Sequence, residues 1–108
     1  MCNKGALNGI KVIDLTRVIS GPFCTLLLAD MGAEVIKIEP PKGDNVRNQG
    51  TFVDGFSSYF SQFNRNKKSV ILDLYRKEDK EKLKKLFIPK QTHIKYMIVQ
   101  EVLTLNFH

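Results

Sequence analysis

Three short stretches of the chain have the hydrophobic patterns of β-strands. Residues 10–15 are β-branched and mostly apolar, residues 34–39 alternate polar and apolar side chains, and residues 69–74 form a third apolar run. Runs of this length bounded by glycine, proline or polar residues are typical of strands. The sequence therefore predicts three strands, of which the first reads as buried on both faces.

Two helices are predicted between and after these strands. Residues 23–31 are mostly apolar, follow Pro22 and precede Gly32. Proline in the first turn with glycine at the stop is the usual asymmetry of a helix. Residues 76–86 carry Glu and Lys pairs four positions apart, which favours a solvent-facing helix. We expect the first helix to join two parallel strands by a right-handed crossover.

The remaining segments lack these regular patterns. Residues 40–56 are rich in Gly, Pro, Asn and Asp and predict a loop, and an aromatic cluster follows at residues 56–63, with core packing favoured over a base-stacking surface. Residues 87–108 differ from the rest, since Pro89 ends the second helix and the apolar run 94–107 could form an added strand or an aggregation-prone edge. We therefore divide the chain into residues 1–86 and an atypical tail, 87–108.

The elements predict an incomplete α/β fold. A parallel sheet needs helices on both faces, and three strands with two helices leave much of the sheet uncovered. The 108 residues, of which 43% are hydrophobic and 26% charged, have ordinary globular composition, which argues against disordered, collagenous and disulfide-scaffold chains. We expect the N-terminal part of a larger α/β domain.

Cysteine content and hydropathy bear on the compartment. Cys2 and Cys24 fit neither a disulfide framework nor a zinc spacing, which favours a reducing compartment. The most apolar run, residues 23–29, is far shorter than the ~20 residues that span a bilayer. We expect no membrane span and a cytoplasmic protein, or a mitochondrial one if a transit peptide lies upstream.

The net charge of +6 is unevenly distributed along the chain. Residues 1–64 carry six basic and six acidic side chains, so the whole surplus follows Asn64. An anionic partner is therefore expected, and a stand-alone basic nucleotide- or nucleic-acid-binding module is one hypothesis. A non-functional truncation product is another.

Three segments are candidates for anion binding, each with a simpler alternative. Residues 14–22 join a strand end to a helix start, where α/β sheets bind ligands, although an ordinary turn has the same pattern. Arg47 could lie over a phosphate or in a solvated loop. Residues 64–68 hold three cations, which suit an anion site or a solvated turn.

Other chemistry finds little support in the residues. His93 and His108 have no partners at metal-ligand spacing, so no metal site is predicted. No Ser/His/Asp or Cys/His set can be assembled, because both histidines lie in the tail. We name no catalytic residue in this chain.

Read in order, five motifs resemble the opening of the class III CoA-transferases, the CaiB/BaiF family. They are GIKVIDLTRV at 9–18, GPFCT at 21–25, LADMGAEVIKIE at 28–39 with Gly43-Asp44, NRNKKS at 64–69, and LDL at 72–74. The resemblance runs from about Leu7 to Leu86. It implies the N-terminal part of a Rossmann-like parallel sheet, that of the family's large domain.

The resemblance also implies a function and a ligand. Family members transfer CoA between carboxylic acids through a covalent aspartyl intermediate, and a related branch racemises acyl-CoA. The CoA nucleotide would lie against Val18, Ile19 and Ser20 and against the segment from Leu72 through Asp73 and Leu74 to Tyr75, and Arg47 is a further candidate for phosphate binding. The expected partners are CoA thioesters, carboxylic acids such as succinate, glutarate, oxalate or formate, and a second copy in an interlocked homodimer, with no nucleic acid, membrane or metal.

Three departures from the family pattern matter. Pro40 stands where some members have Arg, and Tyr75 stands where many have Lys, so two possible phosphate contacts are absent. The catalytic Asp that the resemblance implies lies beyond residue 108. We therefore expect a CoA-binding portion of a transferase that is inactive as this chain.

Overall fold

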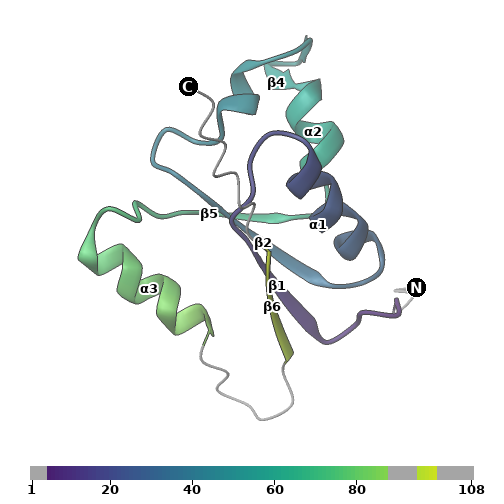
Figure 1. The fold of residues 1–108 in the computed structure, drawn as a ribbon. Helices are drawn as coiled ribbons and strands as arrows, with labels where there is room; N and C mark the ends of the chain where they lie inside the picture. The colour runs from purple at the N-terminus through teal and green to yellow at the C-terminus, as the bar shows by residue number, and fades with distance from the viewer. Residues whose placement is uncertain (1–4, 88–94, 100–108) are drawn as a thin grey trace.

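The computed structural model describes residues 5–87 and 95–99. Figure 1 shows a parallel sheet with helices on both sides. The elements in chain order are β1 (Ile10–Asp14), α1 (Ser20–Asp30), β2 (Glu34–Glu39), the 3₁₀ helix η1 (Asn45–Asn48), β3 (Phe52–Val53), β4 (Phe56–Ser57), α2 (Ser58–Asn64), β5 (Lys68–Ile71), α3 (Lys77–Phe87) and β6 (Lys95–Val99).

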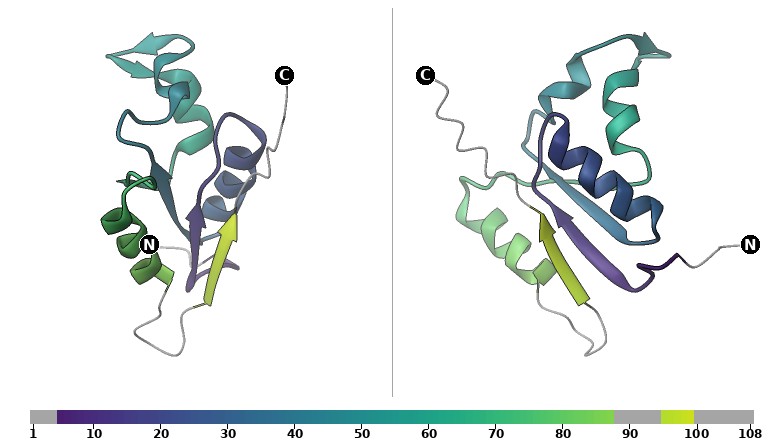
Figure 2. Two further views of the ribbon diagram at one scale, coloured as in Figure 1. Left: turned by 60° about the vertical axis from the view of Figure 1, so that its left-hand side comes forward. Right: turned by 45° about the vertical axis from the view of Figure 1, so that its right-hand side comes forward.

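The main sheet has the strand order β5-β2-β1-β6, and every pair in it is parallel. Val12 lies opposite Val35 of β2, and Ile38 of β2 lies opposite Val70 of β5. Strand β6 lies beside β1 on the edge opposite β5 (Figure 2). The order therefore reverses at β1, which is the arrangement of a doubly wound α/β sheet.

The predicted parallel α/β fold is confirmed, and the tail adds to it. The apolar stretch after residue 94 predicted an added strand or an edge, and β6 takes the first of these roles beside β1. The predicted strand at 69–74 begins one residue earlier and ends at Ile71. Residues 72–74 leave the sheet and form the connection to α3.

The two faces of the sheet carry separate hydrophobic clusters. Successive side chains of a strand point to opposite faces, so Val12 and Val35 face α1 while Ile13 and Ile36 face the other way. Ala29 of α1 completes the first cluster. In the second cluster, Ile38 and Leu72 are buried and Leu83 and Leu86 of α3 pack against them.

Helix α1 forms where the sequence predicts it. Pro22 lies in its first turn, where a missing N–H costs nothing, and Gly32 follows its end with a φ of +102°. A Cβ at Gly32 would lie 2.9 Å from the Cα of Gly5, so glycine is required by both conformation and space. Leu7 then donates its backbone N–H to the carbonyl of Met31, which ties the segment before β1 to the end of the helix.

The segment predicted as a loop with an aromatic cluster contains short regular elements. A 3₁₀ turn, the hairpin β3–β4 and the seven-residue helix α2 succeed one another there. The hydroxyl of Ser57 caps α2 by accepting the backbone N–H of Phe60 at 3.1 Å. Phe63 packs edge-on against Phe23 of α1 with ring centroids 6.4 Å apart, but Phe56 is 70% exposed and none of the aromatic residues at 56–63 is fully buried, so the cluster is partial packing between helices and not part of the core.

No helix among the described residues is long and apolar enough to cross a bilayer.

Candidate functional site

A cavity of about 260 Å³ opens at the carboxyl ends of three adjacent strands. Leu15 and Arg17 after β1 line it from one side, and Pro40 and Pro41 after β2 line it from another. Ile38 and Glu39 at the end of β2 and the segment 72–75 after β5 complete the wall. Open α/β sheets bind ligands at this edge, so the cavity is the strongest candidate site of the described residues.

The residues predicted from the end of the third strand all line this cavity. Leu72 is buried, whereas Tyr75 is 96% exposed. Two hydrogen bonds fix the segment: Asp79 of α3 accepts the N–H of Asp73 at 2.7 Å, and Asp73 accepts the N–H of Tyr75 at 3.0 Å. The start of α3 therefore holds this wall in place.

The β1–α1 turn reaches the cavity through a different residue from those predicted. Val18, Ile19 and Ser20 are exposed and do not line it, whereas Arg17 does. Val18 has a φ of +71°, a rare conformation for a β-branched residue that is typical of functional turns. The predicted binding segment 14–22 contains Arg17, but the sequence analysis did not single it out, although a cation in a strand-to-helix turn was a usable signal.

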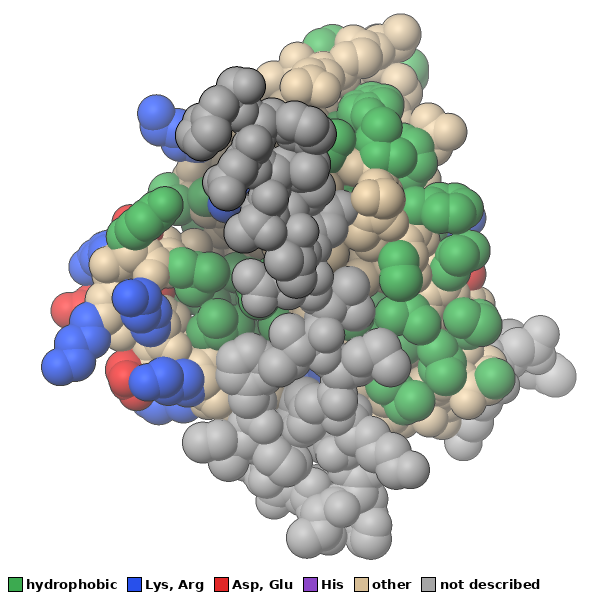
Figure 3. Space-filling view, viewed as in Figure 1, with side chains coloured by type: hydrophobic (Ala, Val, Ile, Leu, Met, Phe, Trp, Pro, Cys, Tyr) green, Lys and Arg blue, Asp and Glu red, His purple; other side chains and the backbone are tan. Residues whose placement is uncertain are grey.

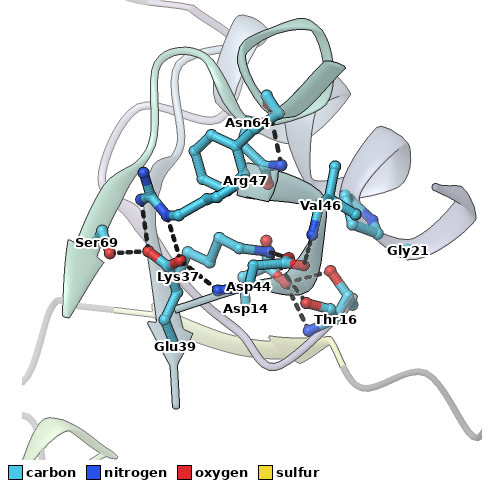
Figure 4. A network of polar contacts seen from close by, with 12 residues as sticks. Asp14, Thr16, Gly21, Lys37, Glu39, Asp44, Val46, Arg47, Asn64 and Ser69 are labelled. Atoms are coloured by element: carbon cyan, nitrogen blue, oxygen red, sulfur yellow. Dashed lines mark hydrogen bonds and ion pairs between the residues drawn. The ribbon is translucent and has the colours of Figure 1, made fainter. Parts of the chain in front are cut away.

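Arg47 lies outside this cavity and is paired with a buried carboxylate. Its Nε and Nη2 each donate to Glu39 at 2.7 Å, and its guanidinium lies 3.8 Å from the centroid of the Phe60 ring (Figure 4). It lines a second cavity, of about 280 Å³, with Phe60 and Ser57. Arg47 therefore does not line the cavity with residues 72–75, although its partner Glu39 does.

Glu39 is the centre of this ion pair. Besides Arg47 it accepts hydrogen bonds from the hydroxyl of Ser69 and from the backbone N–H of Asp44. Burial acts to raise the pKa of Glu39, but these hydrogen bonds and the charge of Arg47 outweigh it and lower the pKa to about 2. The group is therefore a carboxylate at any physiological pH.

A second buried group of charges lies under the β1–α1 turn. Asp14 is fully buried and accepts hydrogen bonds from the backbone N–H and hydroxyl of Thr16, from the hydroxyl of Thr25 at 2.7 Å and from Lys67 at 3.0 Å. Burial would raise the pKa of Asp14, but these partners lower it below its ordinary value. For Lys67, burial is the largest influence and lowers the pKa, against the attraction of Asp14.

The cations of residues 64–68 do not form a free anion site. Arg65 pairs with Asp30 at 2.9 Å, Lys68 pairs with Glu34 at 2.8 Å, and Lys67 is the buried partner of Asp14. Each cation of this run is therefore already paired in the folded chain, and its part in anion binding stays a prediction.

Among the described residues no group of His, Cys, Asp or Glu side chains has a geometry that could hold a metal ion.

Comparison with known proteins decides the family. The sequence profile of CoA-transferase family III matches residues 7–88. The chain belongs to CoA-transferase family III. The resemblance seen in the sequence motifs is thereby confirmed.

Relatives and solved structures of this family agree with that assignment. The chain is 49% identical over 82 residues to a succinyl-CoA:mesaconate CoA-transferase of Haloarcula hispanica, covering 71% of this chain and 21% of the relative. It is 50% identical over 76 residues to the human succinyl-CoA:glutarate CoA-transferase, covering 68% and 17%. A CAIB/BAIF family protein from Brucella suis superposes with a TM-score of 0.72 at 37% identity, over 78% of this chain and 24% of that structure.

The chain spans about a fifth of the length of these curated relatives. Its family membership rests on residues 7–88. The division of the chain at residue 86 stays a prediction.

Proposed function

We propose that this chain is the N-terminal CoA-binding portion of a class III CoA-transferase. The observation that carries the proposal is the cavity at the carboxyl ends of β1, β2 and β5, in a chain of this family. Leu15, Leu72, Leu74 and Tyr75 give it an apolar wall suited to a nucleotide base, and Arg17 supplies a cation for a phosphate. CoA carries both of these chemical features.

Val18, Ile19 and Ser20 do not line the cavity, and we propose that CoA reaches them where it extends past Arg17 toward the start of α1. They follow Arg17 directly, and the strained φ of Val18 turns the chain toward the start of α1. A helix N-terminus favours anions, and no side chain caps α1. Arg47 has a smaller part in this proposal, since Glu39 engages two of its nitrogens.

The substrate class follows from the names of the relatives. Mesaconate, glutarate and oxalate appear as acceptors in the names of similar transferases, with succinyl-CoA, acetyl-CoA or formyl-CoA as donors. All three acceptors are dicarboxylates. We therefore propose that the complete protein moves CoA between carboxylic acids, one of them a dicarboxylate.

The 108 residues by themselves are proposed to bind CoA without turning it over. Asp14, Glu39 and Asp44 are the buried carboxylates among the described residues, and each is engaged by a lysine or arginine. A carboxylate held in this way is a poor nucleophile, because attack would require it to leave its cation in a buried site.

Calorimetric titration of the 108-residue chain with CoA tests the binding claim. We expect saturable binding that Arg17→Ala weakens about 10-fold or more, because a hydrogen bond to a charged group contributes ~1.5–3 kcal/mol. Lys80→Ala is the matched control, since Lys80 is an exposed cation on α3 away from the cavity. Absence of binding by the wild-type chain would refute the proposal.

A gain-of-affinity variant sharpens the test. Tyr75→Lys places a cation at the rim where many family members have one, and we expect it to tighten CoA binding several-fold. An unchanged affinity would mean that the phosphates lie elsewhere.

A transfer assay tests the claim of inactivity. Succinyl-CoA with glutarate, mesaconate or oxalate should give no new thioester with the purified chain, and turnover above the buffer rate would contradict the claim. The interlocked homodimer stays a prediction for this chain, which sedimentation velocity would test.

A further inference from the structure

Two buried lysine side chains hold the two ends of the β1–α1 turn. The Nζ of Lys37 donates to the carbonyl oxygen of Thr16 at 3.1 Å, and the Nζ of Lys67 donates to the carbonyl oxygen of Pro22 at 3.1 Å. Between these two carbonyls lie residues 17–21, which include Arg17 of the cavity wall. The lysines come from β2 and from the segment before β5, so distant parts of the chain meet at this turn.

Both ammonium groups are buried, and each lies beside a buried carboxylate. The side chain of Lys67 is 1% exposed, and its three N–H groups have three acceptors: Asp14 at 3.0 Å, Asn64 at 2.9 Å and the Pro22 carbonyl. The side chain of Lys37 is 2% exposed, and its Nζ lies 2.9 Å from Asp44. Buried ion pairs seldom stabilise a fold more than apolar side chains of similar volume would, so a role in fixing geometry is the better explanation for two of them.

The turn that they bracket needs such support. Val18 has a φ of +71°, and a β-branched residue in this region is strained and keeps the conformation only where its surroundings enforce it. Asp14 contributes by accepting from Thr16 before the turn and from Thr25 after it. Figure 4 shows Asp14 and Thr16 from β1 and its following segment converging with Lys37 and Asp44 below the turn.

We propose that Lys37 and Lys67 are positioning residues that hold residues 17–21 in the conformation that places Arg17 at the cavity, and thereby set the affinity for CoA. Neither lysine lines the cavity, so neither touches the ligand there. The inference rests on the proposed function for its ligand. The hydrogen bonds by which Lys37 and Lys67 hold the turn, called the clamp below, are a property of the chain alone.

The test compares two neighbouring lysines in the full chain. Lys67→Met removes the buried ammonium and keeps an unbranched side chain one atom shorter, and Lys68→Met is the matched control because the side chain of Lys68 is 71% exposed. We expect amide hydrogen exchange of residues 17–21 to accelerate at least 10-fold more than exchange in β2 in Lys67→Met, and the dissociation constant for CoA to rise at least 10-fold. Lys68→Met should change either quantity by less than twofold.

The exchange measurement separates positioning from general stability, because global destabilisation would accelerate β2 and the turn together. Equal exchange at the turn in wild type and Lys67→Met, or unchanged CoA affinity in the presence of faster turn exchange, would overturn the proposal. If Lys67→Met does not fold, Lys67→Gln keeps an N–H donor and is expected to give intermediate acceleration at the turn. Wild-type exchange in the Gln variant would then refute the clamp.

The two proposals fail in different ways. If the wild-type chain binds no CoA, the proposed function is wrong, while the exchange measurement still tests the clamp. If the wild-type chain binds CoA and Lys67→Met binds it equally well, the proposed function stands and the clamp is refuted.

Discussion

The two faces of the sheet are built on different principles. The face toward α3 is aliphatic, with Ile13, Ile36 and Ile38 buried against leucines of the helix, whose charges point to solvent. The face toward α1 carries hydrophobic residues near the amino ends of the strands and buried ion pairs near their carboxyl ends. The outer surfaces of the helices show the opposite distribution from the inner faces: Figure 3 shows charged side chains over α3 and apolar side chains over α1 and α2.

The difference between the faces separates contacts that stabilise the fold from contacts that fix the local geometry. Aliphatic packing is non-directional and tolerates small changes, whereas hydrogen-bonded charges specify one arrangement. The directional contacts of this chain are concentrated beneath the β1–α1 turn and the loop after β2, where Lys37, Glu39 and Asp14 connect four segments. The candidate site lies where the two faces meet: Arg17 and Glu39 line it from the polar side, and Leu15, Ile38, Leu72 and Leu74 of the aliphatic cluster line it from the other.

Breaking one buried ion pair should have the largest effect. Lys37→Met leaves Asp44 buried without its cation, and we expect the free energy of unfolding to fall by about 3–5 kcal/mol. Denaturant unfolding of the variant measures this. Lys68→Met, at an exposed ion pair, should cost less than about 1 kcal/mol. Equal small losses in both variants would mean that the buried ion pair contributes no more to the free energy of unfolding than an exposed one.

Lowering the pH should have the second-largest effect on the stability of the polar face. Because the pKa of Glu39 is lowered from 4.5 to about 2 in the folded chain, its contribution to stability is present above pH 4.5 and is lost as pH falls toward 2. The expected loss is on the order of 2 kcal/mol. Unfolding of wild type and Glu39→Gln between pH 6 and 3 measures it, and the variant should show the shallower slope. Parallel pH profiles would contradict this assignment.

A conservative change on the aliphatic face should cost less. Ile13→Val removes one methylene from a fully buried side chain, for which we expect a loss of about 1 kcal/mol. Ile71→Val is the control, because Ile71 is exposed, and should be neutral within about 0.5 kcal/mol. Thermal unfolding compares the pair, and a larger loss for Ile71→Val would place the core elsewhere.

Relief of backbone strain should give the smallest effect, with opposite sign. Val18→Gly removes the steric cost of a φ of +71° but adds freedom to the unfolded chain, which leaves a net gain of about 0.5 kcal/mol. Denaturant unfolding checks the sign. Destabilisation by more than about 1 kcal/mol would show that the Val18 side chain, and not the clamp, holds the turn.

The strands and helices that depend on local patterns were predictable from the sequence. β1, β2 and α1 occupy nearly the predicted ranges because apolar period, Pro22 and Gly32 all agree there. The seven-residue α2 was missed because a Ser57 cap and a contact between Phe63 and a distant helix support it. Short helices of this kind depend on tertiary packing more than on propensity.

The candidate site was predictable only in part. Residues 72–75 follow a strand end and line the cavity as predicted. Arg47 and the cations after Asn64 looked available because a sequence shows charge but not pairing. The partner of Lys67 lies 53 positions away at Asp14, and that of Arg47 lies in β2, so their burial became visible only once the sheet was assembled.

Nuclear magnetic resonance of the isotope-labelled chain during titration with CoA tests the central claim most directly. We predict saturable shifts of the backbone amides of residues 17–20 and 72–75, with little change on the solvent face of α3. Absence of saturable shifts, or shifts centred on Arg47 and Phe60 around the second cavity, would contradict the claim that CoA binds at the carboxyl ends of the strands.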